Sequence, residues 1–164
     1  MTSKTLNINT KNGVTYITFP KFENTGLVNH LFSTRLGGVS RGKYNSMNLS
    51  FNNGDNRDDV LENYKRLCEC ENIDINHLVL SKQTHTNNIK TVTKSHCGTG
   101  IFKDSFNDID GLITNESSVA LVTQYADCTP LFFLDPIKKS NCLFPRRLAR
   151  HCKADRQKNC GKNA

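Results

Sequence analysis

The chain reads Ser118-Val119-Ala120-Leu121-Val122-Thr123, then Gln124-Tyr125-Ala126-Asp127-Cys128-Thr129, then Pro130-Leu131-Phe132-Phe133-Leu134. Two short apolar runs therefore enclose a polar segment, and each run has the length of a strand rather than of a helix. Their β-branched and aromatic residues favour a sheet. We predict two buried strands here, with Cys128 at a strand end.

The rest of the chain alternates strand and helix signals. A helix is predicted from about Arg57 to Glu71, because Asp55 or Asn56 can cap its first turn. Apolar residues follow that cap at helical spacing, at Val60, Leu61, Tyr64, Leu67 and Cys68. Further strands are predicted at residues 14–19, 31–34, 77–80 and 89–92. The pattern indicates an α/β (α+β) fold with mixed β-sheets flanked by helices.

Length and composition narrow the class of protein. The chain has 164 residues, a length that favours one domain. No stretch approaches the ~18 apolar residues that span a bilayer, and the N-terminus lacks the apolar run of a signal peptide. Seven cysteines at irregular spacing disfavour a secreted disulfide framework. We expect a reduced, cytoplasmic protein that has no membrane partner.

The positive charge gathers at the C-terminal end. Residues 140–164 hold seven basic residues and one acid, a net charge of +6 out of +7 for the whole chain. One interpretation is a nucleic-acid arm whose Lys and Arg side chains neutralise phosphates. The other is a solvated tail without a binding role. The first 139 residues offer no basic or aromatic surface that supports the nucleic-acid interpretation.

A few residues stand in positions suited to chemistry. His85 and Cys128 follow predicted strands, and a His and a Cys at strand ends suit a Zn or Cu site or a thiolate–imidazole pair. Either residue alone more often has a structural role. Cys68 belongs to the apolar face of the predicted helix, so packing is its favoured role. The Gly-rich residues 95–100 are a weak anion-loop signal, and residues 108–111 resemble a calcium loop only superficially.

Four segments occur in a fixed order: Phe32-Ser33-Thr34-Arg35-Leu36-Gly37-Gly38-Val39-Ser40, Asn48-Leu49-Ser50, Gln83-Thr84-His85, and Asp110-Gly111-Leu112-Ile113-Thr114-Asn115 with Tyr125-Ala126-Asp127-Cys128-Thr129-Pro130. Together they resemble the laccase-domain family, also called the multicopper polyphenol oxidase or YfiH-type purine nucleoside phosphorylase family. The set covers most of residues 28–137. The resemblance implies the laccase-domain (YfiH-like) fold.

The same resemblance implies an activity and a site. Members are purine nucleoside phosphorylases with adenosine deaminase and methylthioadenosine phosphorylase activity, and their older assignment is oxidation of phenols with copper.

Two histidines and a cysteine hold Zn or Cu in the family, and His85 and Cys128 match two of these ligands. Arg35 matches a family arginine and is the candidate for an anionic or polar substrate group, with a loop salt bridge as the alternative. Asn48 and Gln83 are expected to brace the loop and the His85 ring. The implied partners are a purine nucleoside and phosphate, with no nucleic acid; no oligomeric state is implied.

The family's hallmark segment, His-Ala-Gly-Trp-Arg-Gly, is absent after the strand that follows Cys128, and the chain has no Trp. Pro145-Arg146-Arg147-Leu148-Ala149-Arg150-His151-Cys152 can be encoded by CCA CGC CGG CTG GCG AGG CAC TGT. Read from its second base, that string encodes His-Ala-Gly-Trp-Arg-Gly-Thr. One extra A in the codons of Lys138-Lys139 would cause the shift.

We therefore interpret residues 1–139 as the N-terminal part of a single laccase-type domain and residues 140–164 as an aberrant basic tail read out of frame. The fold is then incomplete at the C-terminus, and Pro145 stands where the third ligand is expected. Residues 140–164 are expected to be irregular or poorly packed. The alternative to an enzyme is an inactive truncated remnant that lacks the third metal ligand.

Overall fold

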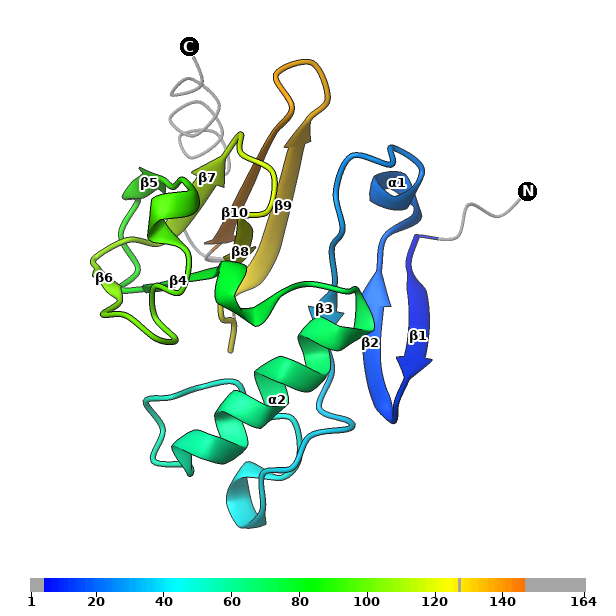
Figure 1. Cartoon of the computed structure of the whole chain (residues 1–164), viewed down its shortest axis with the longest axis vertical. Helices are drawn as coiled ribbons and strands as arrows, with labels where there is room; N and C mark the ends of the chain where they lie inside the picture. The colour runs from blue at the N-terminus through cyan, green and yellow to red at the C-terminus, as the bar shows by residue number, and fades with distance from the viewer. Residues whose placement is uncertain (1–4, 127, 147–164) are drawn as a thin grey trace. The chain divides into compact units, whose positions relative to one another are not determined.

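The computed structural model describes residues 5–126 and 128–146, and the side chains as far as residue 143. The chain divides into two compact units between Ile75 and Asn76 (Figure 1). Each unit is described by itself. Both contain small β-sheets, and helices are few, as expected for the mixed α/β class.

The first unit contains a three-stranded antiparallel sheet in the order β1-β2-β3. Its strands are β1 (Asn7–Lys11), β2 (Val14–Thr18) and β3 (Phe32–Ser33), and the short helix α1 (Pro20–Glu23) follows β2. Asn12 and Gly13 both have positive φ, which matches the tight Asn-Gly turn that joins twisted strands. The strands predicted at residues 14–19 and 31–34 are confirmed. Strand β1 was not predicted, because its Asn-Ile-Asn-Thr-Lys sequence is mostly polar.

Helix α2 (Arg57–Cys70) confirms the predicted helix. It begins where the Asn56 side chain accepts the amide N–H of Asp58 at 2.7 Å. Its buried apolar face packs on the sheet, with Tyr64, Leu67 and Cys68 among the buried residues. Burial raises the pKa of the Cys68 thiol to about 12, so the thiol stays protonated and packs as a small apolar group. The predicted packing role of Cys68 is confirmed.

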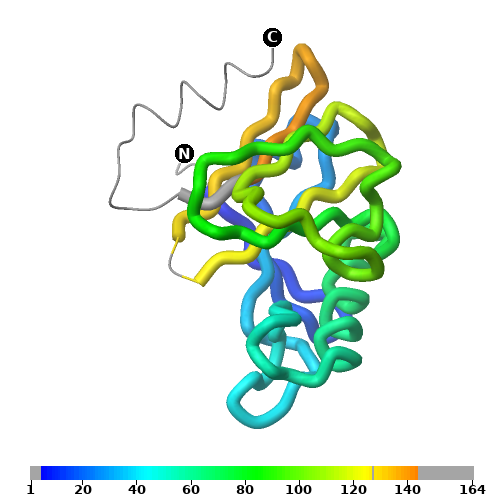
Figure 2. Tube along the Cα trace, turned by 90° about the vertical axis from the view of Figure 1, so that its left-hand side faces the viewer, coloured from blue at the N-terminus to red at the C-terminus, as the bar shows by residue number. Residues whose placement is uncertain are grey.

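Asn63 on α2 holds the loop that runs from β3 to the start of the helix, which includes the 3₁₀ turn η1 (Gly42–Tyr44) (Figure 2). Its side chain is 0% exposed. The amide oxygen accepts the N–H of Val39 at 2.7 Å, and the amide nitrogen donates to Ser40 Oγ at 2.9 Å and to the Asn48 carbonyl at 2.8 Å. Gly38 approaches the Ser46 carbonyl so closely that a Cβ would collide with it. The loop is therefore tied to the helix by a polar residue in the middle of its apolar face.

The second unit contains two sheets. In the all-parallel sheet β6-β4-β8, the central strand β4 (Leu78–Lys82) lies between β6 (Phe106–Asn107) and β8 (Ala120–Val122). The four-stranded sheet has the order β5-β7-β10-β9, with β5 (Ile89–Thr91), β7 (Gly111–Thr114), β10 (Ser140–Arg146) and β9 (Thr129–Asp135). Two 3₁₀ turns, η2 (Ile75–His77) and η3 (Lys94–His96), complete the described elements. The buried cluster consists of Val79, Val92, Leu112 and Val119. All four strands predicted in this part of the chain are confirmed.

Strand β10 corrects one expectation. Ser140–Arg146 is not irregular: it is a central strand that pairs antiparallel with β9 along its whole length and with β7 from Asn141 to Leu143. The physical reason is that ladder hydrogen bonds come from the backbone, so a tight return from β9 can form them with varied side chains. Residues 147–164 lie outside the described part of the chain.

Within residues 5–126 and 128–146, no helix is both long enough and apolar enough to cross a bilayer.

The contacts of Asn63 generate a stability prediction. Asn63→Ala should lower the free energy of unfolding by about 2–4 kcal/mol, because it leaves the half-buried Val39 N–H and the buried Asn48 carbonyl without the Asn63 side chain as a partner. Glu62→Ala, which removes an exposed ion pair with Arg66, is the control and should change it by less than about 1 kcal/mol. Urea unfolding monitored by circular dichroism measures both. Equal stability of the two variants would contradict the role of Asn63 in holding the loop.

Candidate functional site

The sequence predicts three site residues, and the structure places them in two units. His85 and Cys128 both belong to the second unit, whereas Arg35 belongs to the first. His85 lies on the loop after β4 and is exposed. Cys128 lies just before β9 and is half-buried.

The loops that carry His85 and Cys128 leave the same edge of one sheet. Strands β4 and β8 are parallel neighbours, with Leu80 opposite Val122, so their carboxyl ends lie side by side (Figure 1). Beyond the strands, the amide N–H of Gln124 donates to Gln83 Oε1 at 2.8 Å. Gln83 therefore braces the two loops against each other. The sequence motif pointed to Gln83, but its partner Gln124 emerges only from the parallel pairing.

His85 has an unusual backbone for a residue with a side chain. Its φ of 64° lies in the left-handed region. The buried carboxylate of Asp110, 4% exposed, accepts the amide N–H groups of Thr84 and His85, both at 2.9 Å. It also accepts the amide N–H of Thr86 and, at 2.7 Å, its hydroxyl. One carboxylate thus satisfies three successive backbone donors around His85.

Asp108 contributes a second set of contacts to the same loop. Its carboxylate accepts the hydroxyl of Thr84 and, at 3.1 Å, the side-chain amide of Asn88. The Asn88 carbonyl in turn accepts the N–H groups of Asp110 and Gly111 at 3.0 and 3.1 Å. The Asp108–Gly111 segment that resembled a calcium loop is therefore a brace for the His85 loop. Sequence analysis missed this role because its partners lie about 20 or more residues away.

Tyr125 lies in the loop that carries Cys128. Its hydroxyl forms a hydrogen bond with the hydroxyl of Thr123. Burial raises the pKa of Tyr125 to about 12, and the nearby thiols of Cys142 and Cys128 act in the same direction. The phenol therefore stays protonated at neutral pH and does not act as a base.

The donor chemistry fits a metal only in part. An imidazole and a thiol are donors that Zn²⁺ and Cu ions bind. Among residues 5–126 and 128–146, no three His, Cys, Asp or Glu side chains come together as a metal-binding group. At position 145, where the family resemblance puts the third ligand, the chain has a proline, which has no side-chain donor atom. We therefore assign no reaction step to a metal in this chain.

Arg35 lies on the loop held by Asn63, and its Nε donates to the Asn45 carbonyl at 2.6 Å. Asn48 braces the same loop as expected, because its side-chain amide donates to Asp55 Oδ2 at 2.8 Å and accepts from Asn53 at 2.9 Å. Desolvation opposes ionisation of Asp55, but hydrogen bonds from Asn48 and Ser40 outweigh it and hold the pKa of Asp55 below its ordinary value. Arg35 itself is exposed on a well-braced loop.

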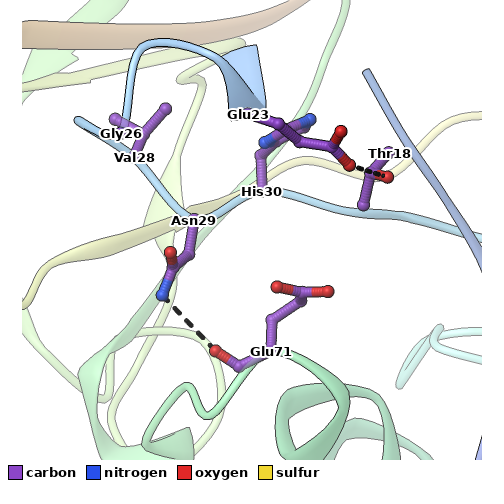
Figure 3. A pocket seen from close by; sticks show the side chains of 7 residues that line it. All are labelled: Thr18, Glu23, Gly26, Val28, Asn29, His30 and Glu71. Atoms are coloured by element: carbon purple, nitrogen blue, oxygen red, sulfur yellow. Dashed lines mark hydrogen bonds between the residues drawn. The ribbon is translucent and has the colours of Figure 1, made fainter. Parts of the chain in front are cut away.

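A separate pocket of about 250 Å³ lies in the first unit, lined by Thr18, Glu23, Gly26, Val28, Asn29, His30 and Glu71 (Figure 3). Its acidic groups are engaged: Glu23 accepts from Thr18 and from Asn7, and Tyr16 forms a hydrogen bond with Glu71. None of the predicted site residues lines it.

The glycine-rich residues 95–100 do not form an anion loop. The N–H groups of Gly98, Thr99 and Gly100 are already donated to carbonyls within the unit, at 2.8, 3.1 and 2.9 Å. Donors used in this way are not free to bind a phosphate.

The chain is similar in sequence to known proteins. The family described as "multi-copper polyphenol oxidoreductase laccase" matches residues 29–143. The purine nucleoside phosphorylase YlmD of Bacillus subtilis is 37% identical over 109 residues, which cover 65% of this chain and 39% of that protein. YlmD of Geobacillus stearothermophilus is 38% identical over 106 residues, which cover 63% of this chain and 39% of that protein. The chain thus spans about two-fifths of the curated relatives it matches.

Two solved structures have a similar fold. The crystal structure of YlmD from Geobacillus stearothermophilus matches with a TM-score of 0.68 and 34% identity, over 70% of this chain and 43% of that one. YfiH from Bacillus licheniformis matches with a TM-score of 0.77 and 24% identity, over 85% of this chain and 51% of that one. The second likeness shows the fold alone.

The pocket of the first unit generates a pH prediction. Burial lowers the pKa of His30, and its Nε2 accepts the Phe19 N–H at 2.8 Å, which requires the neutral ring. A lowered folded-state pKa means that stability is full above the unfolded value of about 6.5 and is lost as the pH falls below it. Urea unfolding at pH 7.5 and 5.5 should show this loss in the wild type.

The loss should be clearly smaller in His30→Gln, whose side-chain oxygen accepts the same N–H without titrating. His77→Gln, which removes a histidine from the second unit, is the matched control and should behave like the wild type. An unchanged pH dependence in His30→Gln would refute the role of His30.

Proposed function

The chain belongs to the multi-copper polyphenol oxidoreductase laccase family, and from that premise we propose that its intact form is a metal-dependent purine nucleoside phosphorylase. It takes a purine nucleoside and inorganic phosphate in the cytoplasm and has adenosine deaminase and methylthioadenosine phosphorylase activity as well. The resident metal in this proposal is Zn or Cu. The relatives named purine nucleoside phosphorylase YlmD support the phosphorylase class.

The observation that carries the proposal is the shared exit of the His85 and Cys128 loops from one edge of the β4–β8 pair. Polar residues that follow neighbouring parallel strands gather at the carboxyl edge of a sheet, which is where α/β proteins bind ligands. The hydrogen bond between Gln83 and Gln124 joins these two loops at 2.8 Å. An imidazole and a thiol on adjacent, braced loops support a shared site.

The reaction sets requirements that these residues meet in part. In phosphorolysis a phosphate oxygen forms a bond to C1′ of the ribose, the C1′–N9 bond breaks, and the purine leaves with a proton. Arg35 is the proposed partner of the phosphate or of another polar substrate group, by paired N–H donation. A bound Zn²⁺ would supply a water of lowered pKa, the chemistry that deamination at C6 needs. His85 and Cys128 are the proposed ligands.

We further propose that residues 140–164 are read out of frame. The Asn141 side-chain oxygen supports this idea, because it is buried in the central strand β10 with no hydrogen-bond partner in the described part of the chain. Buried polar atoms of this kind are uncommon in native structures. In the shifted frame, residues 140–144 can be encoded as Ala-Ile-Ala-Phe-Ser, which places an isoleucine at position 141. An apolar β-branched residue suits a central strand.

The second candidate is an inactive remnant of the family. It is favoured by the same proline at position 145, since the chain as written lacks the third ligand. The two candidates differ in the state of the frame after Lys138-Lys139, and the next experiment separates them.

The chain as written should show no measurable phosphorolysis or deamination of adenosine, even with added Zn or Cu, as assayed by chromatography of adenine and inosine. Deleting one base in the codons of Lys138-Lys139 should bring activity back at least ~100-fold above background, because it restores the third ligand and even changes outside the ligand set cost about 10–100-fold in metal sites. Cys128→Ala in the restored chain is the control and should abolish the activity.

Two outcomes would count against this proposal. If the restored chain is inactive, the inactive remnant replaces the enzyme as the better description. If the chain as written turns over adenosine and Cys128→Ala stops it, two ligands suffice and the third is not essential.

The frame proposal also predicts the effect of one substitution. Asn141→Ile should raise the free energy of unfolding by about 1–3 kcal/mol, because an apolar side chain replaces an amide whose oxygen is buried without a partner. Asn107→Ile places the same change at an exposed position of β6 and should stay within about 0.5 kcal/mol of the wild type. Thermal unfolding measures both variants. A destabilised Asn141→Ile chain would show that Asn141 belongs to the strand.

A further inference from the structure

We propose that Asp110 is a positioning residue that sets the backbone of His85 and thereby the direction of its imidazole. The inference rests on the proposed function, because that function gives His85 its role as a ligand. Asp110 touches neither substrate nor metal in this proposal. It acts through the three N–H groups that its carboxylate accepts.

The number and burial of these contacts make Asp110 more than a surface brace. Asp110 is 4% exposed, so bulk water has little access to its carboxylate. Oδ1 accepts the N–H groups of Thr84 and His85, and Oδ2 accepts the N–H and the hydroxyl of Thr86. Hydrogen bonds to a charged acceptor are stronger than bonds between neutral groups. All four converge on residues 84–86.

The contacts from Asp110 hold His85 in a backbone conformation that the free chain would avoid. With φ at 64°, the β-carbon of His85 is crowded by its own backbone, which residues other than glycine avoid. Such a conformation persists only where the surroundings over-determine it. Without the Asp110 carboxylate, the free chain would favour negative φ at this residue. The Cα–Cβ bond, and with it the ring, would then point elsewhere.

Asp108 provides the comparison that isolates this effect. It lies two residues from Asp110 on the same segment, but its carboxylate holds the loop through the side chains of Thr84 and Asn88 and not through the backbone. Removal of its charge therefore loosens the loop without removing the acceptor of the His85 N–H.

The test uses the full chain and Co²⁺ as the probe, in Asp110→Asn and in the control Asp108→Asn. Two-dimensional NMR reports the backbone directly, because positive φ gives His85 a strong intraresidue NOE between its amide proton and Hα. Co²⁺ absorption, titrated to millimolar metal, reports the ligand set through its d–d bands and thiolate charge-transfer band. His85→Ala and Cys128→Ser identify the bands that belong to these two residues.

Asp110→Asn should weaken the His85 NOE, shift the amide resonances of residues 84–86 and weaken Co²⁺ binding at least ~10-fold, the size of loss that supporting contacts around a metal ligand typically cause. Asp108→Asn should keep the NOE and weaken Co²⁺ binding clearly less than Asp110→Asn does. Thr86→Ala removes one of the four hydrogen bonds to Asp110 and should weaken the NOE and Co²⁺ binding by a smaller amount. This variant replaces Asp110→Asn in the test if Asp110→Asn does not fold. An Asp110→Asn chain with the wild-type NOE and Co²⁺ spectrum would overturn the proposal.

The failure of the proposed function has a different signature. If the Co²⁺ bands of the wild type do not change in His85→Ala and Cys128→Ser, the shared metal site is wrong. The NMR arm still decides on Asp110 in that case. A retained His85 NOE in Asp110→Asn overturns the positioning role, and a lost NOE supports it.

Discussion

A buried carboxylate next to irregular backbone is the constraint on which the proposed site depends. The loop from Gln83 to Asn88 connects β4 of one sheet with β5 of the other, and it contains no secondary structure that could pair its N–H groups. Buried backbone donors must find acceptors or cost free energy. Asp110, directly before β7, supplies one acceptor group for three of them. The loop that carries His85 is thereby held to a strand of the neighbouring sheet.

In the first unit, a neutral residue provides the hydrogen-bond partners for the backbone of an irregular loop. The loop after β3 carries Arg35, and Asn63 on α2 satisfies both a donor and an acceptor of that loop. In both units the functional candidate lies on a loop, and a buried polar side chain holds that loop in place: Asn63 on α2 in the first unit and Asp110, directly before β7, in the second. Such an arrangement places a reactive or binding group on irregular backbone without loss of precision. It also explains why Gly37 and Gly38 are found beside Arg35, since the loop there lies close to other backbone.

Strand β10 illustrates the limits of side-chain reasoning in sheets. Its seven residues pair with β9 at every position, although Asn141 leaves a polar oxygen buried between two neighbours. The backbone ladder forms with almost any sequence. Proline is tolerated where a strand is paired on one side only, as at Pro145, which lies beyond the residues that pair with β7. The side chains decide how well the strand fits. A strand can thus be present in the fold while its side chains show a local conflict.

The sequence by itself determined the α/β class, helix α2 with a cap at Asp55 or Asn56, most strands of both units, and the motif residues Arg35, His85 and Cys128. These follow from local spacing and from ordered motifs, which a single chain displays directly. Only the tertiary structure revealed Asp110, Asn63 and the bond from Gln124 to Gln83 as the groups that hold the site, and only it showed β10 as a central strand. Their partners lie 15 to 41 residues away in the chain, and polar residues at such separations carry no periodic signal. A hydrogen bond depends on where the fold brings two atoms, so its partners become visible only when the strands and loops are in place.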